Sequence, residues 1–225
     1  MSLHICIEYI HVPYRVYYLI NIFFLALAVP IDVAVVFDSA GSGMDSSLFA
    51  RQKKILKILL GSYPFGKDGT QLGVIVNGDR PMVSIYPSTE VKSTVMRRID
   101  DLSPVGSGSN LLSSLKLAVD DIFKRGRKSA VKTLIVFSNS KRNVADIDAL
   151  RDIDTSGLKV IAIGLGDNAN LLDLSKIAKN NGIFVTSANE KDDIDLVANI
   201  FDELDKSKLV FVLKWEAIHG YKSIP

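Results

Sequence analysis

The sequence predicts an α/β fold: a doubly wound, mostly parallel sheet with one antiparallel edge strand and helices on both faces. Three observations predict it. Short apolar runs rich in β-branched residues alternate with amphipathic stretches, as in βαβ units. The first apolar run ends abruptly in an aspartate and then in small and hydroxyl residues, as expected at the carboxyl edge of a buried parallel strand. The 225 residues, 48% apolar and 23% charged, suffice for one globular domain with a full core.

A hairpin is predicted in the first half of the chain. A strand is expected at 31–37, because residues 33–37 form a continuous apolar run, which is typical of a strand buried on both faces. An amphipathic helix is expected at 44–60, where basic residues separate the apolar ones. Strands 71–76 and 82–86 are joined only by the turn at 77–81, so they must pair antiparallel and place the second at a sheet edge.

The second half alternates in the same way. A helical pattern begins at Ser88 and another follows the small-residue loop at 103–110. The other expected elements are strands 131–137, 158–163 and 183–186, and helices 111–123, 145–153, 171–179 and 192–205. An apolar, strand-like run at 209–213 has no predicted partner.

The amino-terminal segment differs in kind from the rest. Tyr17 to Ala28 is nearly all apolar, which is short for a transmembrane span but suits the core of a signal peptide. Ala26-Leu27-Ala28 is an A-x-A cleavage pattern, and it predicts a mature start at Val29. An uncleaved membrane anchor at 17–28 is the alternative. The predicted organisation is a signal peptide at 1–28, a domain at 29–207 and a tail at 208–225.

Composition and motifs exclude several function classes. The 27 basic and 25 acidic residues nearly cancel, so there is no electrostatic case for binding nucleic acid or an anionic membrane. The lone cysteine, Cys6, lies in the removable segment, which excludes thiol chemistry in the mature chain. No G-x-G-x-x-G motif, phosphate loop or G-x-S-x-G elbow with a following histidine is present. The one mature histidine, His219, lies in the tail, so we expect no enzymatic activity.

Polar side chains follow the ends of the predicted strands. They are Asp38, Ser39 and Ser42 in a first loop, Ser107 and Ser109 in a second, and Ser138, Asn139 and Ser140 in a third. The carboxyl ends of parallel strands meet at one edge, so these oxygens would surround one crevice and suit a hard cation such as Mg²⁺. The same residue types also serve as ordinary caps and turns.

The order and spacing of these stretches resemble a von Willebrand factor type A domain, as found in integrins, type VI collagen and matrilin-like matrix proteins. The matching stretches are 32–42 (DVAVVFDSAGS), 108–115 (GSNLLSSL), 133–140 (TLIVFSNS) and 158–166 (LKVIAIGLG). The resemblance covers about 31–205. It implies a Rossmann-like fold and a protein-binding role in adhesion or the extracellular matrix.

The family's metal-ion-dependent adhesion site uses Asp-x-Ser-x-Ser on the first loop, Thr on the second and Asp on the third. Its metal accepts an acidic side chain from the partner. The resemblance places Asp38 and Ser42 at matching positions, and Ser109 supplies a hydroxyl in place of the threonine. Ala40 replaces the first serine and offers no oxygen. Asn139 replaces the third-loop aspartate, so it keeps an oxygen and loses the charge.

These departures predict a degenerate site. Mg²⁺ is costly to dehydrate and is usually held by one or two carboxylates, and here only Asp38 remains. Ser39 does not replace Ala40, because the side chain of a neighbouring residue points elsewhere. We therefore expect no cofactor, with Mg²⁺ at low affinity as the alternative. The site is expected to persist as a hydrogen-bonded relic in which Asn139 donates to Asp38.

The sequence thus favours a secreted, non-catalytic module that binds a matrix or cell-surface protein largely without a metal. Two alternatives stay open. One is Mg²⁺-dependent adhesion through a weak metal site. The other is a membrane-anchored protein in which 17–28 is not cleaved.

Overall fold

The computed structural model describes residues 30–39, 46–61, 63–105, 108–139, 153–167, 169, 171–179, 182–187 and 189–201. The strands are β1 (Ile31–Asp38), β2 (Thr70–Asn77), β3 (Met82–Ile85), β4 (Val131–Ser138), β5 (Leu158–Leu165) and β6 (Ile183–Ser187). The helices are α2 (Ser46–Leu60), α3 (Lys92–Asp100), α4 (Leu111–Leu117) and α6 (Leu171–Ala178). A π-helix, η1 (Ala118–Phe123), continues α4, and a 3-10 helix, η4 (Glu190–Asp192), precedes helical residues 193–201.

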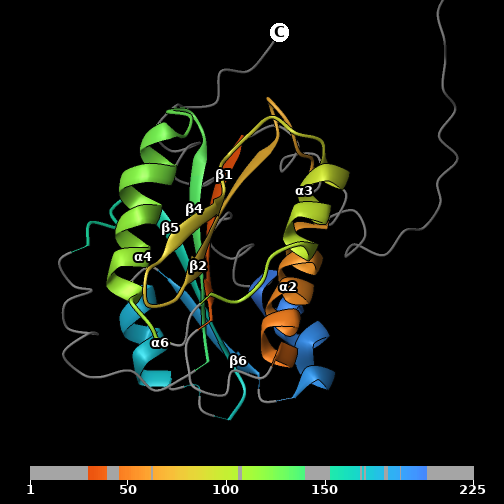
Figure 1. Cartoon of the computed structure of the whole chain (residues 1–225), viewed down its shortest axis with the longest axis vertical. Helices are drawn as coiled ribbons and strands as arrows, with labels where there is room; N and C mark the ends of the chain where they lie inside the picture. The colour runs from red at the N-terminus through yellow and green to blue at the C-terminus, as the bar shows by residue number, and fades with distance from the viewer. Residues whose placement is uncertain are drawn as a thin grey trace, which may run out of the picture.

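The strands form one sheet between two layers of helices, in the order β3-β2-β1-β4-β5-β6. Helices α2 and α3 cover one face and α4 and α6 cover the other (Figure 1). Every neighbouring pair is parallel except β2 and β3, and β3 lies at the edge. The predicted fold class and its antiparallel edge strand are therefore confirmed.

Strand β1 lies in the middle of the sheet and is buried on both faces. Val33, Val35 and Phe37 belong to the core under α2 and α3, with exposures of 4% or less. Ala34 and Val36 belong to the core under α4 and α6 and are fully buried. Because both faces are covered, polar residues are excluded from the strand interior, and this leaves the unbroken apolar run seen in the sequence.

All six strands lie where the sequence predicts them, and no end differs by more than two residues. One helix start is wrong: α3 begins at Lys92 and not at Ser88. Val91 is extended, with ψ of 153°, and the Ser88 hydroxyl donates to the Glu90 carboxylate at 3.0 Å. This local contact competes with a helical first turn.

Several predicted segments fall outside the described residues. They are the signal peptide at 1–28, the helix at 145–153 except its last residue, the end of the last helix at 202–205, and the tail at 208–225. Within the described ranges, no helix is both long enough and apolar enough to span a membrane.

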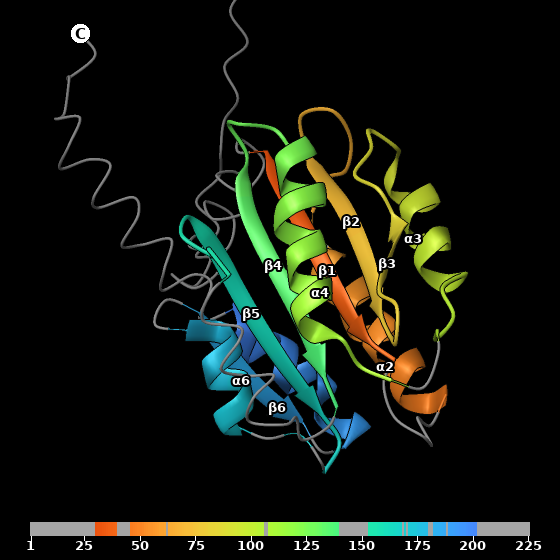
Figure 2. The ribbon, with the colours of Figure 1, turned by 60° about the vertical axis from the view of Figure 1, so that its left-hand side comes forward.

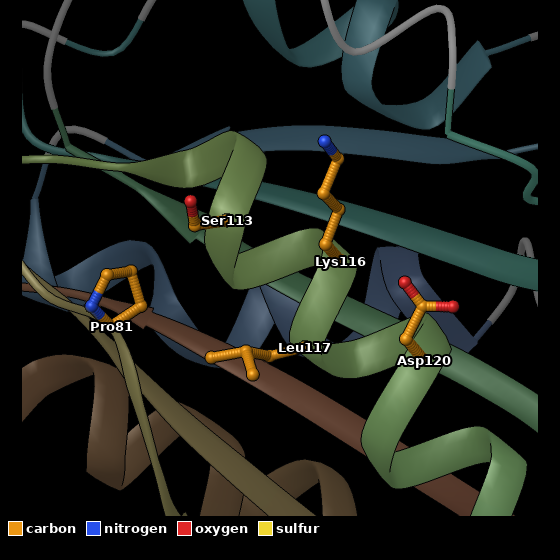
Figure 3. A pocket seen from close by; sticks show the side chains of 5 residues that line it. All are labelled: Pro81, Ser113, Lys116, Leu117 and Asp120. Carbon is orange, nitrogen blue, oxygen red and sulfur yellow. The ribbon is translucent and has the colours of Figure 1, made fainter.

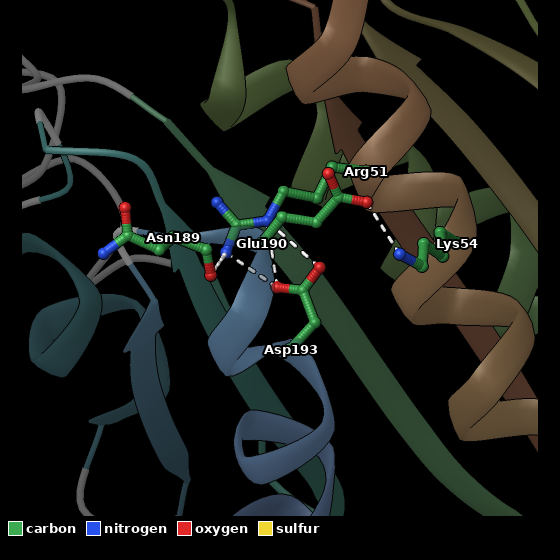
Figure 4. A network of polar contacts seen from close by, with 5 residues as sticks. All are labelled: Arg51, Lys54, Asn189, Glu190 and Asp193. Carbon is green, nitrogen blue, oxygen red and sulfur yellow. Dashed lines mark hydrogen bonds and ion pairs between the residues drawn. The ribbon is translucent and has the colours of Figure 1, made fainter.

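A buried ion pair fastens the last described helix to α2 (Figure 4). Arg51 Nη2 lies 2.7 Å from Asp193 Oδ1, and the two side chains are only 7% and 2% exposed. The same nitrogen donates to the Asn189 carbonyl at 2.6 Å. Asp193 opens the helical stretch 193–201, where a negative charge is also favoured by the helix dipole.

A second ion pair, between α2 and η4, is exposed. Lys54 Nζ lies 2.6 Å from Glu190 Oε1, and their side chains are 54% and 64% exposed (Figure 4). The hydrogen bond that Lys54 donates to Glu190 lowers the pKa of Glu190 and raises the pKa of Lys54. Water and salt screen such a pair, so its contribution to stability is small.

We predict that Arg51→Leu lowers the free energy of unfolding by about 3–5 kcal/mol, because it leaves Asp193 buried without its cation. Urea denaturation followed by circular dichroism measures the change. Lys54→Leu is the matched control on the exposed pair, and its midpoint should stay near that of the wild type. Equal losses in the two variants would contradict the assignment.

Candidate functional site

The candidate site lies where the carboxyl ends of β1, β2 and β4 meet, at the end of the sheet that is lowest in Figure 2. Asp38 ends β1 and pairs in register with Asn77, which ends β2. Asn139 directly follows β4, and Ser109 directly precedes the capping residue of α4. We call these four residues the strand-end cluster.

Asp38 is fully buried and is held through both its side chain and its main chain. Its Oδ1 accepts from Asn77 Nδ2 at 3.2 Å, and its Oδ2 accepts from the Asn139 main-chain N–H at 3.1 Å. Gln52 of α2 accepts from the Asp38 N–H at 3.0 Å and donates to the Asp38 carbonyl at 2.8 Å. Both carboxylate oxygens therefore face N–H donors.

Asn77 connects the first loop to the second. Its Nδ2 donates to Asp38 and also to Ser109 Oγ at 3.0 Å. Its Oδ1 accepts from the Asn110 N–H at 3.0 Å and from the Ser114 hydroxyl at 2.9 Å. A carboxamide offers two donor and two acceptor positions, so every hydrogen-bonding position of this buried amide is used.

The loops around Asp38 are packed closely. The Ser39 hydroxyl contacts the Asn77 carbonyl and lies 2.9 Å from the Val105 carbonyl, so its polar atom is already engaged. A Cβ at Gly78 would lie 2.1 Å from the Val105 carbonyl oxygen. Glycine is therefore required at the turn between β2 and β3, because the next loop presses against it.

The side-chain amide of Asn139 is the part of the cluster that lacks hydrogen bonds among the described residues. Its side chain is buried, with 7% exposure, and neither Oδ1 nor Nδ2 has a hydrogen-bond partner in the described part of the chain. The predicted donation from Asn139 to Asp38 is present, but it comes from the main chain and not from the amide. A buried amide without partners costs about 1–3 kcal/mol per group.

Of the five residues that the family resemblance places at the adhesion site, the structure brings together three: Asp38, Ser109 and Asn139. Ala40 and Ser42 lie outside the described residues.

Asn77, Gln52 and Ser114 were not predicted as members of the site. Asn77 was interpreted as a turn residue, although it ends an apolar strand just as Asp38 does. Gln52 shares the apolar face of α2 with buried Phe49 and Leu56, at a spacing of three and four residues. A polar side chain on that face was the signal that it bonds inside the protein.

The described residues do not fit Mg²⁺ as they stand. Among them, no group of three or more His, Cys, Asp or Glu side chains is placed to hold a metal ion. Mg²⁺ requires oxygen lone pairs directed at one point. The oxygens of Asp38 are instead directed at the N–H groups of Asn77 and Asn139.

A hollow of about 330 Å³ lies between α4 with η1 and Pro81, which precedes β3 (Figure 3). It is lined by Pro81, Ser113, Lys116, Leu117 and Asp120. None of these residues belongs to the cluster, but the Ser113 N–H donates to the side chain of Asn110 at 3.1 Å, and the Asn110 N–H donates to Asn77.

The sequence profile of the von Willebrand factor type A domain matches residues 32–203. The chain is 23% identical over 150 residues to the collagen alpha-1(XXI) chain of Xenopus laevis, covering 66% of this chain and 16% of the collagen. Its fold is similar to that of proximal thread matrix protein 1 from the mussel byssus. That comparison has a TM-score of 0.69 and 21% identity, and it covers 78% of this chain and 48% of the mussel protein.

Two further structures of similar fold were solved with metal. One is the mussel protein with a zinc-occupied MIDAS motif, with a TM-score of 0.63, 23% identity and coverage of 76% of this chain and 46% of that one. The other is the manganese-loaded TRAP protein of Plasmodium vivax, with a TM-score of 0.61, 14% identity and coverage of 76% and 73%. At these identities the likeness establishes the fold alone.

We predict that Asp38→Asn lowers the free energy of unfolding by about 1.5–3 kcal/mol, the range for a hydrogen bond to a charged group. Both oxygens of Asp38 accept from N–H groups, so the new NH₂ must face one of those donors. Urea denaturation measures the loss. Asp101→Asn, an exposed substitution after α3, is the control and should leave the midpoint near the wild-type value. A midpoint for Asp38→Asn equal to that of the control would show that these bonds add no stability.

Proposed function

The chain belongs to the von Willebrand factor type A domain family, and from this premise we propose that it is a non-catalytic module that binds a matrix or cell-surface protein. The relatives reported above include a collagen and a byssal matrix protein, which supports the adhesion or matrix setting. The chain spans only 16% of the collagen and about half of the mussel protein, so the partners of those proteins are not transferred to it.

We further propose that binding is largely independent of metal. The observation that carries this proposal is the buried Asp38 carboxylate, each of whose oxygens accepts from an N–H group of the protein itself. These bonds keep the first loop in place without a cation. The partner then contacts the surface around the strand-end cluster directly, and no metal-bound acidic side chain is needed.

The alternative is Mg²⁺-dependent adhesion through a weak site formed by Asp38, Ser42, Ser109 and Asn139. Its support is that the mussel protein has a zinc-occupied MIDAS motif and the Plasmodium protein is manganese-loaded. The Asn139 amide, which is buried and has no hydrogen-bond partner among the described residues, also supplies an oxygen that can bind a cation. Removal of divalent cations distinguishes the two candidates.

For localisation, we propose secretion after cleavage of a signal peptide at 1–28. The support is the apolar run at 17–28 with its A-x-A ending. The alternative is that this run stays as a membrane anchor.

A binding experiment tests metal independence. Purified protein is applied to a surface coated with solubilised extracellular-matrix proteins, in buffer containing either EDTA or millimolar MgCl₂. We expect the half-saturating concentration to agree within about twofold, because the Asp38 bonds need no cation.

The control is a von Willebrand factor type A domain with an intact adhesion site, whose binding EDTA should abolish. A tenfold or larger loss for this chain in EDTA would favour the Mg²⁺-dependent alternative. Failure to bind any matrix or cell-surface preparation under either condition would contradict the adhesion proposal itself.

Amino-terminal sequencing tests the localisation. We expect protein from the medium of expressing eukaryotic cells to begin at Val29, because cleavage follows the A-x-A pattern. Ala26→Arg and Ala28→Arg together should block cleavage by placing bulky charge at the small-residue positions. Protein that is retained in membranes and contains 17–28 would support the anchor instead.

A further inference from the structure

We infer that the side-chain amide of Asn77 takes the structural place of the cation in this domain and locks the first two loops together. This inference rests on the metal independence proposed above. The family resemblance assigns Asp38 and Ser109 to a cation, but here both accept a hydrogen bond from one nitrogen, Asn77 Nδ2, at 3.2 and 3.0 Å. A single positively polarised group thus links the carboxylate of the first loop to the hydroxyl of the second.

The orientation of the amide follows from its surroundings. Asn77 Oδ1 faces the main-chain N–H of Asn110, which can only donate. Asn77 Nδ2 faces Asp38, whose carboxylate can only accept when ionised. Rotating the amide by half a turn would place a donor against a donor and an acceptor against an acceptor. The arrangement therefore has one favourable state.

A cation entering this position would have to break both bonds from Nδ2. Asn77 is fully buried, so its two N–H groups would lose their partners away from water. Among the described members of the cluster, only Asp38 can give the cation a negative charge, because Asn77 and Asn139 both carry neutral amides. Desolvation of Mg²⁺ is not offset by such a neutral set of ligands.

A carboxylate at residue 77 should make the cluster dependent on a divalent cation. Asn77→Asp keeps the shape of the side chain and removes both N–H donors. It places a second negative charge within hydrogen-bond distance of Asp38, which is unfavourable until a cation lies between them. Oδ1 of the new carboxylate still accepts from Asn110 and Ser114. The substitution should therefore convert a closed cluster into one that needs a divalent cation.

Thermal unfolding and calorimetric titration of the full chain with MnCl₂ test this. The wild-type Tm should not change with millimolar MnCl₂ beyond the shift that NaCl causes at equal ionic strength. Asn77→Asp should lower the Tm by roughly 5 °C or more without cation, and MnCl₂ should restore it saturably with measurable heat. Asn77→Ser, the neutral control, should lower the Tm and show no response to MnCl₂.

The exchange variant Asp38→Asn with Asn77→Asp completes the set, since it keeps one carboxylate and one amide in swapped positions. It should be more stable than Asn77→Asp alone and insensitive to MnCl₂. If Asn77→Asp does not fold even with MnCl₂, recovery of folding in the exchange variant supports the inference and its absence overturns it.

The outcomes separate this inference from metal independence. A saturable rise in the wild-type Tm with MnCl₂, with heat of binding, overturns both. The role of Asn77 alone is overturned by three results together. The wild-type Tm does not change with MnCl₂, the Tm of Asn77→Ser equals that of the wild type, and the Tm of Asn77→Asp does not respond to MnCl₂.

Discussion

The burial of β1 on both faces is the constraint on which the rest of the structure depends. A strand with no exposed side leaves the carboxylates at its ends without water, so the protein must supply their partners. At the amino end, Asp32 is 1% exposed and pairs with Arg127, whose Nη2 lies 2.6 Å from Oδ1. At the carboxyl end, Asp38 accepts from Asn77 and from the main chain of Asn139. Each end of β1 is thus bonded to residues from other parts of the chain: Asp32 to Arg127, and Asp38 to Asn77 and Asn139.

Three basic residues in the stretch 124–128 (KRGRK) are also paired within the chain. Lys124 and Arg125 each contact an aspartate one turn earlier, at 2.8 and 2.6 Å. Arg127 is used by Asp32 and by the carbonyls around it. Three of these cations therefore have acidic partners in their own domain, and the stretch is not a patch of free positive charge.

The order of elements could be predicted from the sequence because burial on both faces leaves unbroken apolar runs, as at 33–37. The π-helical turn at η1 could not be predicted. Ile122 there lies so close to Gly73 of β2 that a Cβ on the glycine would be 2.7 Å away, and this contact exists only once helix and strand are packed. Asp38 and Asn139 were identified because they follow apolar strands, and the family resemblance then assigned them to the adhesion site. Asn77 was missed because its role depends on the register that aligns it with Asp38, which turn-forming residue types do not reveal.

An amide in the place proposed for it links the first two loops as a cation would, but it supplies no charge. A divalent ion orients the loops and also supplies two positive charges, which attract an acidic side chain of the partner. Asn77 links the loops through its two donated bonds and adds no net charge. Under the metal independence proposed above, no metal-bound acidic side chain of the partner is needed, and the partner contacts the surface around the strand-end cluster directly.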